Sequence, residues 1–208
     1  MTLTDTDLPG VRLIEPKTFD DERGFFYESF NLERFHSELG LKAVNFVQDN
    51  HSVSKGGVVR GIHYQTDPMA QGKLVRVVYG EVFDVAVDLR RESKYFGRYA
   101  AAVLSAENRK QLWIPQGFGH GFLALSDRVE MLYNTTNYYS STHEVCIRWD
   151  DPDLAIEWPE IAYPIVLSDK DKQGLGLGEA ELFCSPSGGC VGKIHGCISV
   201  PSQAHQPP

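Results

Sequence analysis

The sequence lacks several features that would mark other classes of protein. No uncharged apolar run approaches the ~18 residues that a membrane-spanning helix needs. Basic residues are outnumbered, with 20 Lys and Arg against 28 Asp and Glu, which gives a formal net charge of -8. Such a chain has no overall positive field for DNA, RNA or an anionic membrane. An anionic ligand would therefore need a local cluster of basic groups.

Cysteine is also scarce, with 4 in 208 residues, and a chain of this size does not need a disulfide framework. Cys184, Cys190, His195 and Cys197 offer zinc-binding groups but contain no Cys-x-x-Cys pair, so zinc there is the less favoured interpretation. The first ten residues, MTLTDTDLPG, are polar and acidic and do not resemble a signal peptide. We therefore expect a cytoplasmic protein.

The composition changes near residue 184. Hydrophobic residues make up 42% of the chain and charged residues 23%, as in ordinary globular proteins. Residues 184–208, however, are rich in Gly, Ser and Pro and contain no acidic residue. We expect one domain over residues 1–183, followed by a flexible tail over residues 184–208. No internal repeat of a solenoid period is present.

The domain is predicted to be mostly β-structure. In residues 82–89, Phe83, Val85 and Val87 alternate with Val82, Asp84 and Ala86, which is the period of a strand. One helix is expected at 32–39, with Asn31 as its N-cap and Gly40 at its end. Many short strands separated by turns predict an all-β sandwich, jelly roll or barrel. The other expected strands cover residues 44–53, 74–79, 99–104, 121–125 and 129–133.

One predicted strand carries an unusual face. In residues 44–53, Val44, Phe46, Gln48 and Asn50 point to the same side. A buried amide without a partner costs a few kcal/mol, so two amides in a dry core would need partners. We favour the alternative, in which the interior of the barrel is a wet binding cavity.

Two histidines stand in strand-like segments. His63 lies in RGIHYQ, and His120 lies in PQGFGHGF, whose Pro-x-Gly-x-x-His pattern resembles the second signature of cupin barrels. Metal-binding cupins have His-x-His in the first signature, and here Gln65 takes the place of the second imidazole. Because Zn, Fe or Mn sites usually need three or more protein ligands, we expect a barrel without metal. A metal-dependent cupin enzyme, such as an oxygenase, remains an alternative.

Six segments in order carry a closer resemblance, over about residues 3–175. They are EPKTFDDERGFFYESFN, NFVQDNHSVSKGGVVRGIHYQ, QGKLVRVVYGEVFDVAVDLRRES, LSAENRKQLWIPQGFGHGF, LYNTTNYYS and LSDKD. Together they resemble the dTDP-4-dehydrorhamnose 3,5-epimerase family, which implies a cupin-type jelly-roll barrel. One turn departs from the family's Tyr-x-Pro-x-x-Glu pattern, because Ser141 replaces the proline between Tyr139 and Glu144.

The resemblance implies an isomerase that works without a cofactor. Members convert dTDP-4-dehydro-6-deoxy-D-glucose to dTDP-4-dehydro-L-rhamnose by removing a proton next to the 4-keto group and reprotonating the opposite face. It assigns the base to His63, its carboxylate partner to Asp171, the acid to Tyr133 and stabilisation of the enolate to Lys73. Asp84 is a reserve partner for His63, although a structural carboxylate is the favoured interpretation.

The resemblance also assigns residues that bind the nucleotide sugar. Arg23, Arg60 and Lys170 match positions that contact the diphosphate, and arginine suits phosphate because its planar fork donates two parallel hydrogen bonds. The other matching substrate contacts are Glu28, Gln48 and Asn50 for thymine, together with His120, Tyr139 and Glu144.

Three points stay open at the level of sequence. Arg60 and His63 are three residues apart, so they reach one pocket only through a bulge at Gly61 or with Arg60 curving round the rim. The family's homodimer, with exchanged N-terminal strands, would let Arg23 and Glu28 serve the neighbouring subunit. Alternative functions are a single-site C3 or C5 epimerase and a binding module without turnover.

Overall fold

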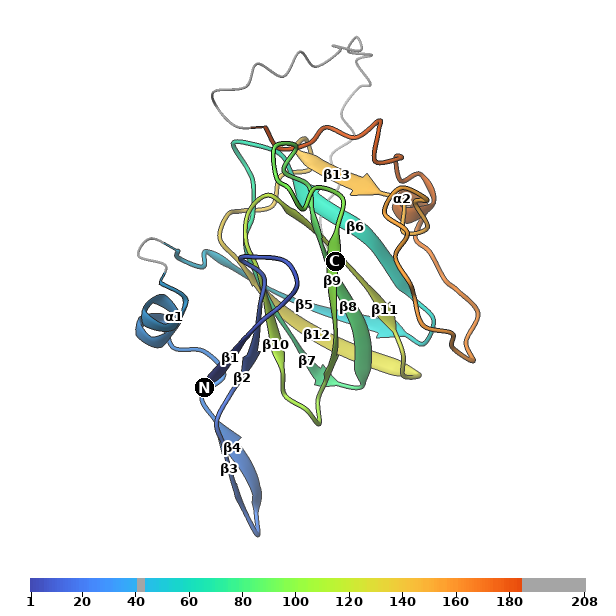
Figure 1. The fold of residues 1–208 in the computed structure, drawn as a ribbon. Helices are drawn as coiled ribbons and strands as arrows, with labels where there is room; N and C mark the ends of the chain where they lie inside the picture. The colour runs from blue at the N-terminus through green and yellow to red at the C-terminus, as the bar shows by residue number, and fades with distance from the viewer. Residues whose placement is uncertain (41–43, 185–208) are drawn as a thin grey trace, which may run out of the picture.

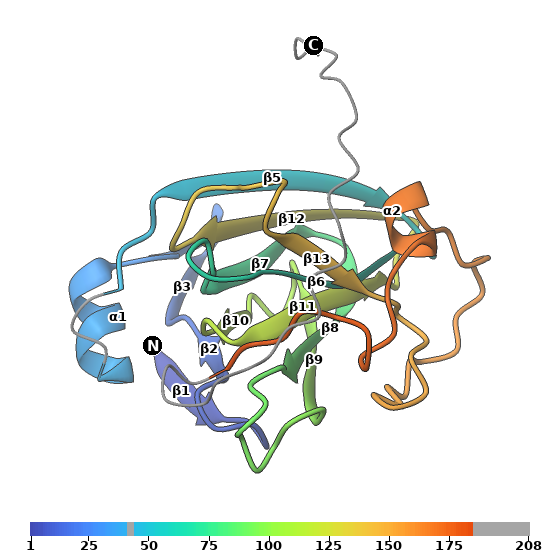
Figure 2. The same ribbon diagram turned by 90° about the horizontal axis from the view of Figure 1, so that it is seen from above.

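Two β-sheets face each other and enclose the interior of the molecule (Figures 1 and 2). The structure is a computed structural model, and it describes residues 1–40 and 44–184. The six-stranded sheet contains, in spatial order, β1 (Thr2–Asp5), β2 (Arg12–Glu15), β10 (Gln111–Ile114), β7 (Lys73–Tyr79), β12 (Arg128–Thr135) and β5 (Gln48–Lys55). The five-stranded sheet contains β13 (Glu144–Ile147), β6 (Val59–Gln65), β11 (Phe118–Ala124), β8 (Glu81–Asp88) and β9 (Tyr99–Ser105). This architecture confirms the predicted all-β jelly-roll barrel with a short helix. The predicted tail lies outside the described residues, apart from Cys184.

Apolar side chains fill one end of the space between the sheets. Val75 and Val77 of β7 meet Val82 of β8, Phe118 of β11 and Leu112 of β10 in one buried cluster. Because this cluster closes part of the barrel, only the remaining part of the interior is open to a ligand.

Strand β8 is buried on both faces, which the alternation of residues 82–89 could not show. Val82 and Ala86 point into the barrel, whereas Val85 and Val87 belong to a second cluster outside it. The chain after β13 covers that outer face through apolar residues including Leu154, Leu177, Ala180 and Leu182.

Helix α1 (Leu32–Leu39) has the predicted boundaries. Asn31 accepts a hydrogen bond from the Arg34 amide at 3.1 Å, and Gly40 ends the helix in the left-handed region with a φ of 66°. Phe35 packs edge-on against Trp113 at 5.1 Å between ring centroids. Phe46 joins this cluster ahead of β5, so the strand predicted from residue 44 begins at Gln48 instead.

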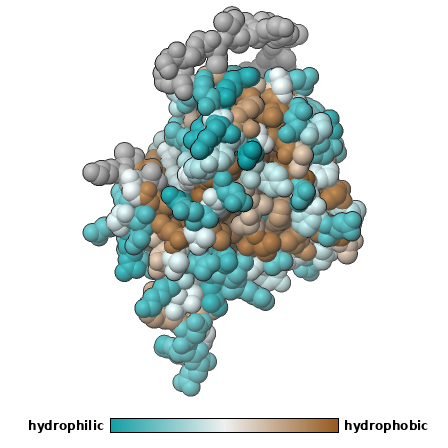
Figure 3. Space-filling model, viewed as in Figure 1, coloured by the Kyte–Doolittle hydropathy of each residue, from teal (hydrophilic) through white to brown (hydrophobic). Residues whose placement is uncertain are grey.

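A two-stranded hairpin, β3 (Thr18–Asp21) and β4 (Gly24–Tyr27), projects away from the two sheets (Figure 1). Its tip is hydrophilic in Figure 3. Phe19, Phe25 and Phe26 on its strands are 55%, 54% and 68% exposed, respectively. Such a run of exposed aromatic rings is unusual for the surface of a lone subunit.

No helix in the described ranges has the length and apolar character needed to cross a membrane.

Candidate active site

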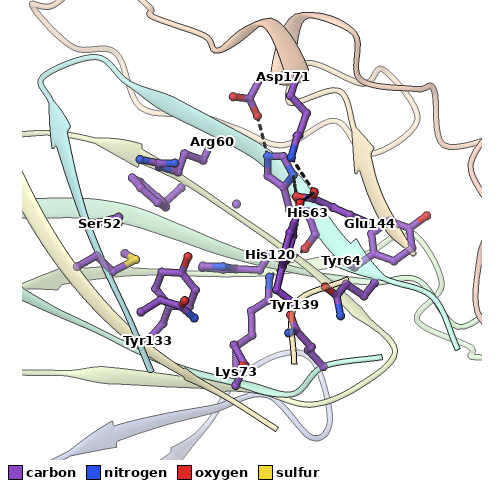
Figure 4. A pocket seen from close by; sticks show the side chains of 18 of the residues that line it. Ser52, Arg60, His63, Tyr64, Lys73, His120, Tyr133, Tyr139, Glu144 and Asp171 are labelled. Carbon is purple, nitrogen blue, oxygen red and sulfur yellow. Dashed lines mark hydrogen bonds and ion pairs between the residues drawn. The ribbon is translucent and has the colours of Figure 1, made fainter. Parts of the chain in front are cut away.

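A cavity of about 420 Å³ opens between the two sheets, in the part of the barrel that the apolar cluster leaves free (Figure 4). It brings together residues from β5, β6, β7, β11, β12, β13 and the short helix α2 (Asp169–Lys172). The predicted residues that line it are Gln48, Asn50, Arg60, His63, Lys73, His120, Tyr133, Tyr139, Glu144, Lys170 and Asp171.

His63 and Asp171 form a hydrogen-bonded pair at one wall of the cavity. The distance between His63 Nε2 and Asp171 Oδ1 is 2.8 Å. Burial opposes protonation of His63, but its contacts with Asp171, Cys146 and Glu144 outweigh burial and raise the pKa to about 10. Burial also opposes ionisation of Asp171, yet its hydrogen bonds hold the pKa well below its usual range. The pair is thus an imidazolium and a carboxylate at neutral pH.

The sequence around Asp171 fixes its carboxylate in place. Ser168 and Asp171 form a capping box at the start of α2: the Ser168 hydroxyl accepts the Asp171 amide at 3.2 Å, and Asp171 Oδ2 accepts the Ser168 amide at 3.3 Å. The Ser168 hydroxyl also donates to Asp171 Oδ2 at 2.5 Å. Asp171 Oδ1 also accepts the Gly61 amide at 2.8 Å. A side chain at Gly61 would approach Asp171 Oδ1 to 3.2 Å and the Ile147 carbonyl to 3.1 Å, so glycine suits this close approach.

A bulge in β6 resolves the spacing of Arg60 and His63. His120 of β11 pairs with His63, and Phe122 pairs with Arg60. A step of two residues along β11 therefore corresponds to a step of three residues along β6. This is the bulge that the sequence left as one of two options, and it lies at Gly61 and Ile62. Both side chains therefore line the same cavity.

Glu144 on β13 is the centre of a charged cluster on the other side of His63 (Figure 4). Its Oε2 accepts the Tyr139 hydroxyl at 2.7 Å and the Lys170 ammonium at 2.6 Å. Its Oε1 lies 3.6 Å from His63 Nδ1. The contacts with His63, Lys170 and Tyr139 outweigh burial and lower the pKa of Glu144 to about 2. The carboxylate is therefore ionised at neutral pH.

Lys73 at the start of β7 lies in the cavity, with its ammonium 3.2 Å from the carbonyl oxygen of His63. Burial lowers the pKa of Lys73 to about 8, against the opposing pull of Glu144 and Asp84. A cation that is poorly solvated in this way interacts strongly with an anion that forms beside it.

Tyr133 of β12 lies across the cavity from His63, on the opposite sheet (Figure 4). It is half-buried, and burial raises the pKa of its phenol. Arg60 opposes this shift. The hydroxyl is therefore protonated at neutral pH and can act as a proton donor.

Asp84 pairs with His120 rather than with His63. The distance from His120 Nε2 to Asp84 Oδ2 is 2.9 Å, and the Asp84 side chain has no solvent exposure. The reserve role that we considered for Asp84 is thus wrong, since it orients a different imidazole.

The polar face of β5 lines the cavity as predicted. Gln48 donates to Asn50 at 2.9 Å and accepts the backbone amide of Tyr139 at 3.0 Å. The two side-chain amides are thus hydrogen-bonded to each other, Gln48 is also hydrogen-bonded to the segment after β12, and both side chains line the cavity.

Arg23 and Glu28 do not reach this cavity. Arg23 lies in the turn of the β3–β4 hairpin and pairs with Asp21 at 2.5 Å. Glu28 pairs with Arg34 at 3.3 Å beside α1. Within one subunit the structure does not bring them to the other predicted site residues, because the hairpin that carries Arg23 points away from the barrel and Glu28 lies beside α1.

Several residues of the site were not predicted, although strand alternation offered a signal for some of them. Ser52 follows Asn50 at a spacing of two, Thr135 follows Tyr133, and Cys146 follows Glu144. Alternation within an assigned strand thus points to residues that no motif marks. The residues that we missed include Ser52, Tyr64, Gln71, Gly121, Phe122, Met131, Thr135, Ser168 and, beside His63, Cys146.

His63, Cys146 and Asp171 also offer donor atoms that a cation could use, all within 4.8 Å of one another. Cys146 Sγ lies 3.8 Å from His63 Nε2 and 4.0 Å from Asp171 Oδ1. The hydrogen bond between His63 and Asp171 already accounts for this closeness. Gln65, in the place of the missing cupin imidazole, is occupied with the backbone of Met69, Tyr138 and Ser140. The geometry therefore favours proton transfer.

Residues 5–179 match the family described as dTDP-4-dehydrorhamnose 3,5-epimerase. The enzyme of that name from Shigella flexneri is 55% identical over 183 residues, which cover 88% of this chain and 99% of the relative.

Solved structures agree with this match. The dTDP-6-deoxy-D-glucose-3,5-epimerase RmlC from Legionella pneumophila Philadelphia 1, in complex with dTDP-4-keto-L-rhamnose, is 45% identical with a TM-score of 0.85 and covers 89% of this chain and 99% of its own. ChmJ from Streptomyces bikiniensis, a 3'-monoepimerase in complex with dTDP-quinovose, is 33% identical with a TM-score of 0.76 and covers 83% of this chain and 86% of its own. By sequence, fold and the extent of both matches, the chain belongs to the dTDP-4-dehydrorhamnose 3,5-epimerase family.

Proposed function

We propose that the protein is a dTDP-4-dehydrorhamnose 3,5-epimerase, which inverts C3 and C5 of dTDP-4-dehydro-6-deoxy-D-glucose. The observation that carries this proposal is the placement of an imidazole–carboxylate pair and a phenol on opposite walls of one cavity, with a buried ammonium between the sheets. Inversion next to a ketone needs a base on one face of the sugar, an acid on the other and a cation at the ketone oxygen.

The first half of the reaction breaks a C–H bond. Neutral His63 takes the proton through Nδ1, since Nε2 is held by Asp171. The electron pair of the C–H bond moves onto the ketone oxygen and forms an enolate, which the ammonium of Lys73 stabilises. Asp171 stabilises the imidazolium that forms.

The second half returns a proton to the opposite face. Tyr133 donates its phenolic proton to the carbon, the enolate reverts to the ketone, and the phenolate regains a proton from water. His63 releases its proton to water before the other carbon reacts. The sequence then repeats at the second carbon, with no redox change.

The rest of the cavity is proposed to bind the nucleotide. Arg60 and Lys170 supply the positive charge for the diphosphate, and Gln48 and Asn50 face the space as hydrogen-bonding partners for thymine. His120, oriented by Asp84, and Tyr139, at the cavity edge, complete the substrate contacts.

We also propose a homodimer in which the β3–β4 hairpin enters the neighbouring subunit's site. The exposed Phe25 and Phe26 support it, as does the distance of Arg23 and Glu28 from their own cavity. If Arg23 serves the neighbouring site, mixing Arg23→Ala and His63→Asn subunits restores up to a quarter of wild-type activity, because half of the dimers are mixed and each has one intact site. Absence of recovery from subunits shown to exchange would contradict the shared site.

A cytoplasmic location remains a prediction from the sequence.

Incubation with the substrate in deuterated water tests the function. The proposal predicts deuterium at both C3 and C5, whereas no incorporation at either carbon would refute it. Label at one carbon would indicate the single-site epimerase, the alternative that the similarity to the 3'-monoepimerase ChmJ supports. Binding of dTDP without any exchange would indicate a binding module.

A further inference from the structure

The nitrogen of His63 that must meet the substrate is not open to the cavity. His63 Nδ1 is buried and finds no hydrogen-bond partner among the described residues. A carboxylate oxygen, Oε1 of Glu144, lies 3.6 Å from it. A base whose reactive atom is covered in this way cannot take a proton from carbon until the cover moves.

We propose that Glu144 is a displaceable cap on His63: its carboxylate covers Nδ1 in the substrate-free protein, and the incoming sugar displaces it. This inference rests on the proposed function, and it makes Glu144 a positioning residue that acts through His63 rather than a simple substrate contact.

The surroundings of Glu144 are suited to such a movement. Its Oε2 is held from the cavity edge by the Tyr139 hydroxyl and the Lys170 ammonium, and these two side chains are 54% and 53% exposed respectively. Exposed partners can follow the carboxylate or exchange it for water at little cost. Lys170 also lines the cavity, where a diphosphate would compete with Glu144 for its ammonium. The diphosphate, which dTDP also carries, therefore only loosens the contacts that hold the cap, and the sugar is the part of the ligand that displaces it.

The cap also sets the charge of the base. Five groups from four elements face His63: Asp171 from α2, Glu144 and Cys146 from β13, Lys73 from β7, and His120 paired with it on β11. Two of them are carboxylates, and both favour the imidazolium. Removal of one carboxylate lowers the proton affinity of His63, so the Nδ1 proton passes to water and leaves a neutral base. Displacement of the Glu144 carboxylate thus exposes His63 Nδ1 to the substrate and deprotonates it in the same step.

Calorimetry of ligand binding tests the proposal without turnover. The titrant is dTDP-glucose, which has a sugar but no ketone, and dTDP alone is the matched ligand. Titrations at pH 8 in buffers of different ionisation enthalpy give the number of protons released. We expect the wild-type protein to release about 0.3 to 1 proton more with dTDP-glucose than with dTDP. The Glu144→Gln variant, whose side chain has the same shape but no charge, should show no such difference.

The comparison of the two ligands removes contributions that they share, such as proton uptake by Lys73 next to the diphosphate. Glu107→Gln, an exposed substitution between β9 and β10, is the matched control and should behave as the wild type does. Equal proton release for both ligands in the wild type would overturn the cap, as would a difference that survives in Glu144→Gln. Failure of dTDP itself to bind would instead refute the proposed function.

Discussion

Replacing Asp171 by Asn removes the negative charge beside His63 while keeping the shape of the side chain. The amide oxygen can still accept from His63 Nε2 and from the Gly61 amide, and the amide nitrogen can donate to the Ser168 hydroxyl. Most of the hydrogen bonds therefore persist; the bond from the Ser168 amide to Oδ2, 3.3 Å long, is lost. The chief loss is the attraction between a carboxylate and the imidazolium that forms during proton abstraction.

The size of that loss follows from Coulomb's law. Charge centres about 4 Å apart at an effective dielectric constant of about 20 attract each other by about 4 kcal/mol. In the substrate complex, where the base is neutral, half to all of the imidazolium charge develops in the transition state. The barrier counted from that complex therefore rises by about 2 to 4 kcal/mol, which lowers kcat roughly 30- to 1,000-fold.

Deuterium incorporation at C3 and C5, followed by proton NMR, measures the rate for the Asp171→Asn variant. Affinity for dTDP should be unchanged, and the acid limb of kcat/KM should move to lower pH because the imidazolium has lost a partner. Wild-type rates, or slower rates with an unmoved pH profile, would refute the reasoning and leave Asp171 with a structural role only.

Three further predictions concern the same cavity. His63→Asn should abolish exchange while dTDP affinity survives; exchange at the wild-type rate would refute the assigned base. Lys73→Met should lower kcat roughly 100- to 1,000-fold, the usual cost of losing an oxyanion donor, and a fall confined to KM would contradict this role. In the free protein, the neutral fraction of His63 rises with pH through about 10, whereas the charged fraction of Lys73 falls through about 8. The profile of kcat/KM should therefore be highest between these values, and an acid limb centred near pH 6.5, the ordinary value for histidine, would contradict it.

Local patterns predicted much of the scaffold. The ends of α1 follow from Asn31 and Gly40, whose capping preferences depend on the adjacent backbone alone. The cavity-facing amides Gln48 and Asn50 follow from strand alternation. Alternation failed for β8, because its burial on the outer face depends on a segment far along the chain.

The site was harder to predict from the sequence, because its contacts join segments that are far apart in the chain. The sequence separation of His63 and Asp171 is 108 residues, and only the resemblance to a family paired them. The bulge in β6 could not be chosen over its alternative, since it depends on the pairing with β11. The position of Glu144 against His63 Nδ1 depends likewise on the register between β13 and β6.

The central claim is that base and acid stand on opposite walls, and Tyr133→Phe tests it most directly. We predict that this variant, in deuterated water, still exchanges the protons of C3 and C5 through His63, but returns deuterium to the original face and forms no L-sugar. Product formation at the wild-type rate, with inversion at both carbons, would contradict the account.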